Sequence, residues 1–156
     1  MTKTPWRIEG CTVADGAALA HNNFPAFWTD PTWRVIWPMC VTPKFVITQG
    51  VLRGPRNLLR DRATLRHQKA VDPATGGVVG YARWILPPSL AGDAAWPEAQ
   101  VPDVSDEEKA EIERVAETAW WHFNDADTAL DIAMSKRKNE MLAEREYLGE
   151  FQGVVV

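Results

Sequence analysis

Aromatic side chains are concentrated in the segment from residue 23 to residue 38. Three of the eight tryptophans lie in it beside two phenylalanines: Phe24, Phe27, Trp28, Trp33 and Trp37. Tryptophan supplies a large, flat apolar surface with one polar N–H group. Prolines at positions 25, 31 and 38 interrupt the segment, which predicts a shaped loop with at most short helical turns. Such a loop can line an apolar pocket or cap the core, and the sequence leaves both interpretations open.

Residues that could act as nucleophiles, bases or metal ligands are few and scattered. The three histidines, His21, His67 and His122, fall on different predicted elements and show no local signature of a triad with Cys11 or Cys40. The two cysteines are too few for a disulfide framework or a metal site. His67 alternates with a leucine, and we interpret it as an outward or cross-strand residue rather than a base. Four glutamates at helical spacing predict a solvated helix face, not a metal site: Glu107, Glu108, Glu111 and Glu113.

Charge is distributed unevenly along the chain. Residues 1–78 hold 10 Lys/Arg against 5 Asp/Glu, and residues 79–156 hold 7 against 16, which gives the net charge of -4. A nucleic-acid surface and a site for CoA or another phosphate ligand are two interpretations of the basic part. We favour a third, a solvated face that pairs with the acidic second half, so nucleic-acid binding is not expected. The basic part is concentrated in Arg53, Arg56, Arg60, Arg62, Arg66 and Lys69.

Length and composition favour one domain over residues 1–156. A chain of 156 residues with 46% hydrophobic residues is long enough to bury a core. The sequence has no run of about 18 apolar residues, so we expect no membrane association through a helix. The first residues lack the apolar stretch of a secretory signal, and two cysteines suit a reducing compartment. We therefore expect a cytoplasmic protein.

The clearest local pattern is a β-hairpin. Its arms are residues 62–72 and 78–86, and proline with paired glycines supplies the turn over residues 73–77. Residues 87–104 are rich in proline and alanine, which predicts a flexible insertion. Capping residues and apolar spacing predict the other elements: a strand over 7–13, helices over 15–23 and 42–53 with a further turn over 56–60, helices over 105–123 and 127–145, and a strand over 147–156.

The order of these elements, together with three local motifs, resembles the N-terminal half of the GCN5-related N-acetyltransferase (GNAT) family. The motifs are residues 7–19, the stretch Leu-Arg-Gly-Pro-Arg-Asn-Leu-Leu over 52–59, and Val-Gly-Tyr-Ala-Arg-Trp over 79–84, which is similar to the third strand of the family. The likeness is to the fungal type, with a long insertion after that strand. It implies an α+β fold with a partial, mixed sheet in the order β-α-α-β-β-α-α-β.

The resemblance implies acyl transfer from acetyl-CoA to an amine acceptor. It places the acceptor pocket on the aromatic segment and the third strand: Phe27, Trp28, Trp33, Tyr81 and Trp84. In the family, a basic-x-x-Gly-x-Gly loop at a helix start binds the CoA pyrophosphate through backbone N–H groups. Residues 147–156 contain Gly149 and Gly153 but not this loop. We therefore expect the C-terminal cofactor half to be missing, and neither catalytic nor cofactor-binding residues are assigned.

A non-catalytic role is the alternative. In this interpretation the chain keeps the half-fold and uses a tryptophan-rich surface to hold a small apolar molecule or another protein chain. A truncated sheet presents an unpaired edge strand, and unpaired edges promote pairing between chains. The alternative therefore predicts self-association through the sheet edge.

Overall fold

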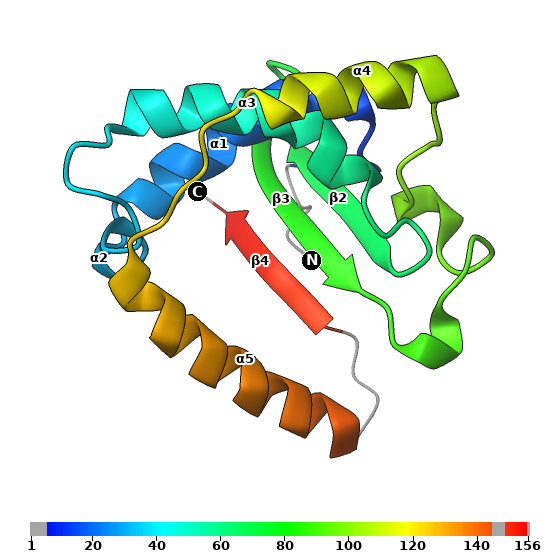
Figure 1. The fold of residues 1–156 in the computed structure, drawn as a ribbon. Helices are drawn as coiled ribbons and strands as arrows, with labels where there is room; N and C mark the ends of the chain where they lie inside the picture. Colours follow the sequence, from blue (N-terminus) through cyan, green and yellow to red (C-terminus); the bar gives the residue numbers. More distant parts are fainter. Residues whose placement is uncertain (1–5, 145–148, 156) are drawn as a thin grey trace.

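The computed structural model describes residues 6–144 and 149–155. The protein is an α+β fold in which two helices pack on one face of an antiparallel sheet (Figure 1). Its strands and helices follow the chain in this order: β1 (Arg7–Gly10), α1 (Gly16–Trp28), α2 (Pro31–Arg34), α3 (Pro43–Leu59), β2 (Leu65–Val71), β3 (Val78–Ile85), α4 (Asp106–Glu117), α5 (Asp125–Glu144) and β4 (Gly149–Val155).

The four described strands lie side by side in sequence order, β1-β2-β3-β4. All three strand pairs are antiparallel, so the prediction of a mixed sheet is wrong for the described strands. The physical reason is the connectivity: β2 and β3 are joined by a tight turn, which forces opposite directions. β1 and β4 form the two edges of this sheet. Self-association through an edge stays a prediction.

The predicted hairpin is confirmed as β2 and β3. Its turn is closed by two backbone hydrogen bonds, from Asp72 N to the Gly77 carbonyl at 2.9 Å and from Gly76 N to the Asp72 carbonyl at 2.8 Å. Gly76 has a φ of 72°, a left-handed conformation that glycine adopts without a steric cost. The Asp72 carboxylate accepts from Ala74 N at 2.9 Å, which completes the turn.

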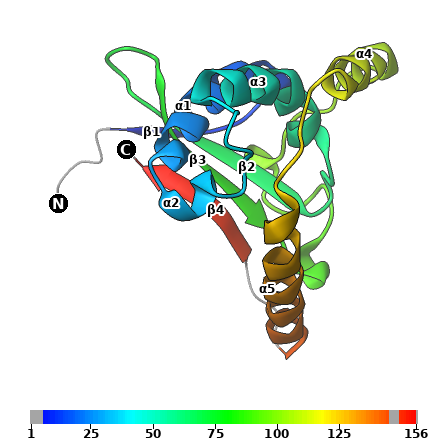
Figure 2. The same ribbon diagram turned by 60° about the vertical axis from the view of Figure 1, so that its left-hand side comes forward.

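Two helices run through prolines that were expected to end them. α1 continues past residue 23 through Pro25 to Trp28, and α3 continues past residue 53 through Pro55 to Leu59. The predicted aromatic loop is thus helical over much of its length. An internal proline removes one hydrogen bond, but α1 and α3 pack closely along their length and hold the helical path (Figure 2).

The next helix is shorter than predicted. α4 ends at Glu117, so residues 118–124 lead to α5 as an irregular segment. The backbone N–H of Trp120 donates to the Gln49 side chain at 2.8 Å, a partner outside the helix. This contact gives the Trp120 N–H a partner in place of a helical one. The prediction that a helix continues to residue 123 is wrong. The predicted end of the last helix at residue 145 and the start of the last strand at residue 147 lie outside the described residues.

Arg66 anchors residues 87–104 on the sheet face that lies opposite α1 and α3. Its side chain is 0% exposed. The guanidinium donates to five backbone carbonyls, those of Arg62, Leu65, Gly92, Ala95 and Trp96, at 2.5–3.1 Å. Burial lowers the pKa of Arg66, and the nearby Arg62 charge acts in the same direction. Because carbonyl oxygens surround the cation, it stays solvated by the protein itself.

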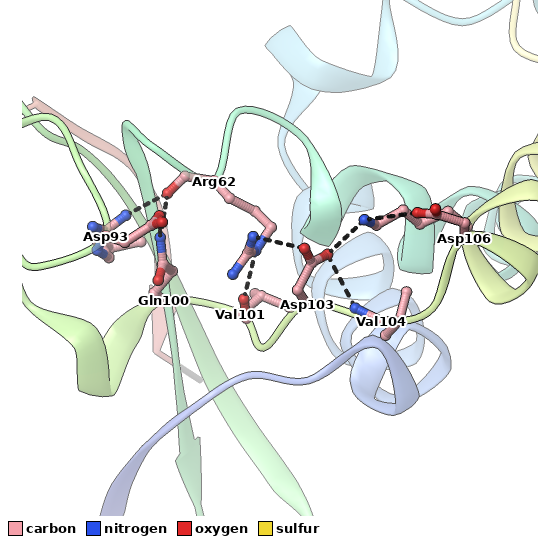
Figure 3. A network of polar contacts seen from close by, with 9 residues as sticks. Arg62, Asp93, Gln100, Val101, Asp103, Val104 and Asp106 are labelled. Carbon is pink, nitrogen blue, oxygen red and sulfur yellow. Dashed lines mark hydrogen bonds and ion pairs between the residues drawn. The ribbon is translucent and has the colours of Figure 1, made fainter.

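A second polar network fixes the end of the same segment (Figure 3). Arg62 donates to the Val101 carbonyl at 2.9 Å and pairs with Asp103 at 3.3 Å. The Gln100 side chain donates to the Arg62 carbonyl at 2.9 Å and to Asp93 at 2.8 Å. Val101 is 1% exposed, so this part of the predicted insertion belongs to the core. These contacts oppose large movement of residues 87–104. The flexibility of this segment stays a prediction.

Part of the basic cluster pairs with carboxylates. Arg56 meets Glu113 at 3.2 Å, so α3 is linked to the acidic helix α4. Lys69 meets Asp15 at 2.6 Å, and this ion pair together with hydrogen bonds from Thr12 lowers the pKa of the Asp15 carboxyl, although burial opposes the shift. The Arg56–Glu113 and Arg62–Asp103 pairs join the basic cluster to the acidic second half, as interpreted, whereas Lys69 pairs within the first half.

α1 and α3 approach each other most closely at two glycines. A Cβ atom built on Gly54 would lie 2.8 Å from the Gly16 Cα, and one built on Gly16 would lie 2.7 Å from the Pro55 Cδ. Both distances are shorter than carbon–carbon contact allows. Neither position therefore accepts a side chain unless the two helices move apart.

We expect Gly54→Ala to destabilise the protein. Alanine favours a helix over glycine by about 1 kcal/mol, but overpacking typically costs about 1–3 kcal/mol, and here the clash is with backbone atoms. Thermal unfolding should show a lower midpoint by several degrees. Thr48→Ala, at an exposed position of the same helix, is the control and should change the midpoint little. An equal or raised midpoint for Gly54→Ala would contradict the close approach.

Candidate functional site

A cavity of about 360 Å³ lies between α1, α2, α3, β3 and the segment that follows α4. Six phenylalanine and tryptophan rings line it: Phe24, Phe27, Trp33, Trp37, Trp121 and Phe123. The described polar side chains in the wall are Asn23, Asn57, Tyr81 and Arg83. Apolar walls with a few convergent polar groups are characteristic of small-molecule sites, which typically enclose about 300–1,000 Å³.

The rings of the wall pack on one another. Trp33 is central: its ring centroid lies 5.8 Å from that of Phe27 in a stacked arrangement, 5.9 Å from Phe24 and 5.4 Å from Trp37. Trp37 meets Trp121 edge-on at 4.9 Å. Each such contact is favourable beyond the burial of apolar area. The wall is therefore held in place by its own packing.

Local hydrogen bonds position the two segments that carry these rings. The Asp30 carboxylate caps α2 by accepting from Thr32 N at 2.8 Å. This hydrogen bond fixes the short helix that carries Trp33. Asn124 donates from its side chain to the Val35 carbonyl at 2.7 Å and to the Trp37 carbonyl at 3.0 Å. The hydrogen bonds of Asn124 join the end of the segment after α4 to the residues after α2. They hold the part of the wall that contains Trp121 and Phe123 against the part that contains Trp37.

A buried tyrosine–histidine pair lies at the sheet side of the cavity. The Tyr81 hydroxyl and His67 Nδ1 are 2.7 Å apart, and their rings stack with centroids 6.0 Å apart. His67 is 2% exposed, so the interpretation of it as an outward residue is wrong, whereas the cross-strand contact is confirmed. Sequence alternation did not reveal its burial, because α1 and α3 cover the sheet face on which His67 lies.

Burial controls the ionisation of this pair. It lowers the pKa of His67 to about 4, with smaller contributions from the charges of Arg83 and Arg66. Burial also raises the pKa of the Tyr81 phenol well above its usual range. At neutral pH both groups are thus uncharged, and they are joined by one hydrogen bond. Burial likewise raises the pKa of the neighbouring Cys11 thiol to about 12, so this cysteine is not a thiolate nucleophile.

The hydrogen bond between His67 and Tyr81 has two possible directions, because the donor depends on the imidazole tautomer. His67 Nε2 is buried and has no hydrogen-bond partner among the described residues. With the imidazole proton on Nδ1, His67 donates to the Tyr81 oxygen; with the proton on Nε2, the Tyr81 hydroxyl donates to Nδ1.

Three of the five predicted site residues line the cavity: Phe27, Trp33 and Tyr81. Trp28 belongs to the same aromatic cluster, but it packs beside the cavity, where its ring meets Trp33 and the Arg34 guanidinium at 4.8 Å. Trp84 lies on the opposite face of the sheet. It donates to Gln68 at 3.1 Å, and its ring lies 5.8 Å from that of Trp96.

The lining residues that sequence reasoning missed lie in three parts of the chain. Phe24 and Trp37 belong to the aromatic segment that the sequence analysis identified. The sequence did not show that their side chains face the cavity. Arg83 alternates with Tyr81 on β3, so it faces the same side of the sheet. Trp121 and Phe123 are distant in sequence, and no local signal connects them with residues 23–37.

No metal centre is found within the described part of the chain, where His, Cys, Asp and Glu side chains do not gather in groups of three. Both cysteines are free, Cys11 buried and Cys40 exposed. None of the helices in the described ranges has the length and apolar character needed to cross a membrane.

Comparison of the chain with protein-family models, with curated proteins and with solved structures finds no match.

We expect the stability of the protein to fall as the pH is lowered from about 6.5 towards 4. The pKa of His67 is about 4 in the fold against an ordinary 6.5, so the unfolded chain binds this proton first. One pKa unit corresponds to about 1.4 kcal/mol, so the free energy of unfolding should drop by about 3 kcal/mol at most. Urea unfolding at a series of pH values measures this.

His67→Asn should flatten that dependence, because it removes the titrating group, even if it lowers the stability at pH 7. His21→Gln, at an exposed position, serves as the matched control and should keep the wild-type slope. An unchanged slope in His67→Asn would show that other groups cause the acid sensitivity.

Proposed function

We propose that this chain binds a small, planar and largely apolar molecule in the aromatic cavity. The observation that carries the proposal is the composition of the wall, in which six aromatic rings surround about 360 Å³ beside a few polar groups. Aromatic rings offer flat faces to a flat ligand and gain from stacking as well as from burial. The volume suits a ligand of one or two fused rings.

The arrangement of the wall supports binding by a preformed site. Trp37 is 1% exposed, and its ring is packed against both Trp33 and Trp121. Side chains that are already fixed lose little conformational freedom when a ligand arrives, which favours affinity. Phe123 is 48% exposed, so one side of the wall faces solvent and offers a route of entry.

Acyl transfer from acetyl-CoA to an amine acceptor is the second candidate function. The observation that favours it is the order of elements along the chain, with helices between β1 and β2 and again between β3 and β4, which agrees with the order that the resemblance to the GNAT family implies. In this proposal the cavity is the acceptor pocket, and Phe27, Trp33 and Tyr81 contact the acceptor. The residues that would bind acetyl-CoA remain unassigned.

For either candidate function we propose a cytoplasmic location. It is supported by the two free cysteines, since a reducing compartment keeps thiols unpaired.

We expect the neutral probe 2-naphthamide to bind the wild-type chain in isothermal titration calorimetry. Phe27→Ala removes a ring that stacks on Trp33 in the wall, and it should weaken binding by about tenfold, since stacking and lost burial together amount to 1–2 kcal/mol. Phe45→Ala is the matched control. Phe45 meets Trp120 outside the cavity, so its removal should leave affinity unchanged. The absence of any heat of binding on the wild-type chain would reject the proposed site.

The acetyltransferase candidate predicts binding of acetyl-CoA. Titration of the chain with acetyl-CoA should give a saturable signal that free adenosine does not reproduce, because the thioester and pantetheine arm would contribute to binding. No binding at millimolar acetyl-CoA would exclude this candidate for the chain as it stands, and it would leave the aromatic cavity as a binding site alone.

A further inference from the structure

One polar side chain of the cavity wall, that of Asn57 on α3, indicates which polar group the ligand carries, and this inference rests on the proposed binding function. We propose that the ligand binds Asn57 through a neutral amide-type group, such as a carboxamide or a lactam, in which a C=O and an N–H lie side by side. A carboxamide side chain offers the same two groups, so the pair forms two hydrogen bonds. The expected ligands are therefore ring compounds with an amide edge.

Asn57 has hydrogen-bonding capacity that the protein does not use, in contrast to the other polar side chains of the wall. The Asn23 side-chain oxygen accepts from Asn22 Nδ2 at 3.0 Å, and the Tyr81 hydroxyl is hydrogen-bonded within the protein. Arg83 has an interaction partner of its own. The side chain of Asn57 lines the cavity and makes no hydrogen bond with any described residue. Both its oxygen and its NH2 group are thus available to a ligand.

The local structure of α3 does not account for an asparagine at position 57. This residue lies in the last turn of the helix, which ends at Leu59. Asparagine favours a helix less than alanine or leucine does, because its side chain competes for backbone hydrogen bonds. A local bond from the side chain to the backbone often compensates for this cost, and none is found for Asn57 within the described ranges. Residues that break a local rule without such compensation are expected at functional sites.

The surroundings of Asn57 strengthen a hydrogen bond to a ligand. Its side chain is half-buried, and the next residue, Leu58, is 3% exposed in the core cluster against which Tyr81 packs. Water competes less for a hydrogen bond in such a place than at an exposed surface. The Tyr81 hydroxyl also lines the cavity, and it keeps one further donor or acceptor for either tautomer of its imidazole partner.

An amide-type group matches Asn57 better than a charged group does. A carboxylate would use only the NH2 group of Asn57 and would leave its oxygen facing another acceptor. An ammonium group would use only the oxygen and would leave the NH2 group facing other donors. Leaving one polar group of a buried pair without a partner costs free energy, so the ligand that satisfies both groups is favoured.

The test compares two neutral ligands of nearly the same shape, 2-naphthamide and 2-acetylnaphthalene, in which a methyl group replaces the NH2 group. Both are titrated into the whole chain by isothermal titration calorimetry. Asn57→Leu replaces the carboxamide of the protein by an apolar group of similar size. We expect the ratio of the affinity for the amide to that for the ketone to fall by about tenfold in this variant, because the ketone leaves the wild-type Asn57 oxygen without a donor.

Two further variants complete the test. Asn57→Ala removes the carboxamide without adding apolar bulk, favours the helix, and should lower the ratio to a similar extent. Asn139→Leu, at an exposed position of α5, is the matched control and should keep the wild-type ratio. An unchanged or raised ratio in both Asn57 variants would overturn the inference while the proposed binding function stands. If neither ligand binds the wild-type chain, the proposed function itself fails.

Discussion

The close approach of α1 to α3 at Gly16 and Gly54 is the constraint on which the rest of the structure depends. Because neither glycine has a side chain, the two helix backbones meet directly and form one layer over the sheet. Gly50, one turn earlier on α3, leaves room for the ring of Phe24 from α1. The same contact thus closes the core beside Leu19 and Leu58 and shapes one wall of the aromatic cavity.

The two faces of the hairpin serve different purposes. On one face, Tyr81 and Arg83 lie under the helices and supply polar groups to the cavity, and His67 holds the Tyr81 hydroxyl from behind. On the other face, the Arg66 guanidinium donates to backbone carbonyls of residues 87–104 and holds this segment against the sheet. Neighbouring residues of one strand point to opposite faces, so His67 packs under the helices and Arg66 packs under the following segment. Both side chains are buried.

Sequence patterns predicted the features that depend on residues close together in the sequence. The hairpin and the capped helix starts at Thr42 and Ser105 are all present. The errors come from packing between distant segments. α1 and α3 pass through Pro25 and Pro55 because each helix supports the other, and beyond the early end of α4 the Trp120 N–H donates to Gln49 instead of to a helical carbonyl.

Only part of the cavity was predicted, because contacts between distant segments also form its wall. Phe27, Trp33 and Tyr81 follow from an aromatic segment and a strand. Trp84 is three residues from Tyr81 on β3, so it lies on the other face, where it contacts Gln68 and Trp96. Nothing in the local sequence indicates that Trp121 completes the wall, because it reaches the cavity only through contacts fixed by Asn124.

The most direct test of the account is to locate a bound ligand by the tryptophan indole N–H signals in a ¹H–¹⁵N NMR spectrum. Each signal can be assigned by a single Trp→Phe substitution. On addition of 2-naphthamide, we predict shifts of the signals of Trp33, Trp37 and Trp121, which line the cavity, and unchanged signals for Trp84 and Trp96 on the opposite face. Shifts confined to Trp84 and Trp96, or no shifts at saturating ligand, would contradict the assignment of the aromatic cavity as the binding site.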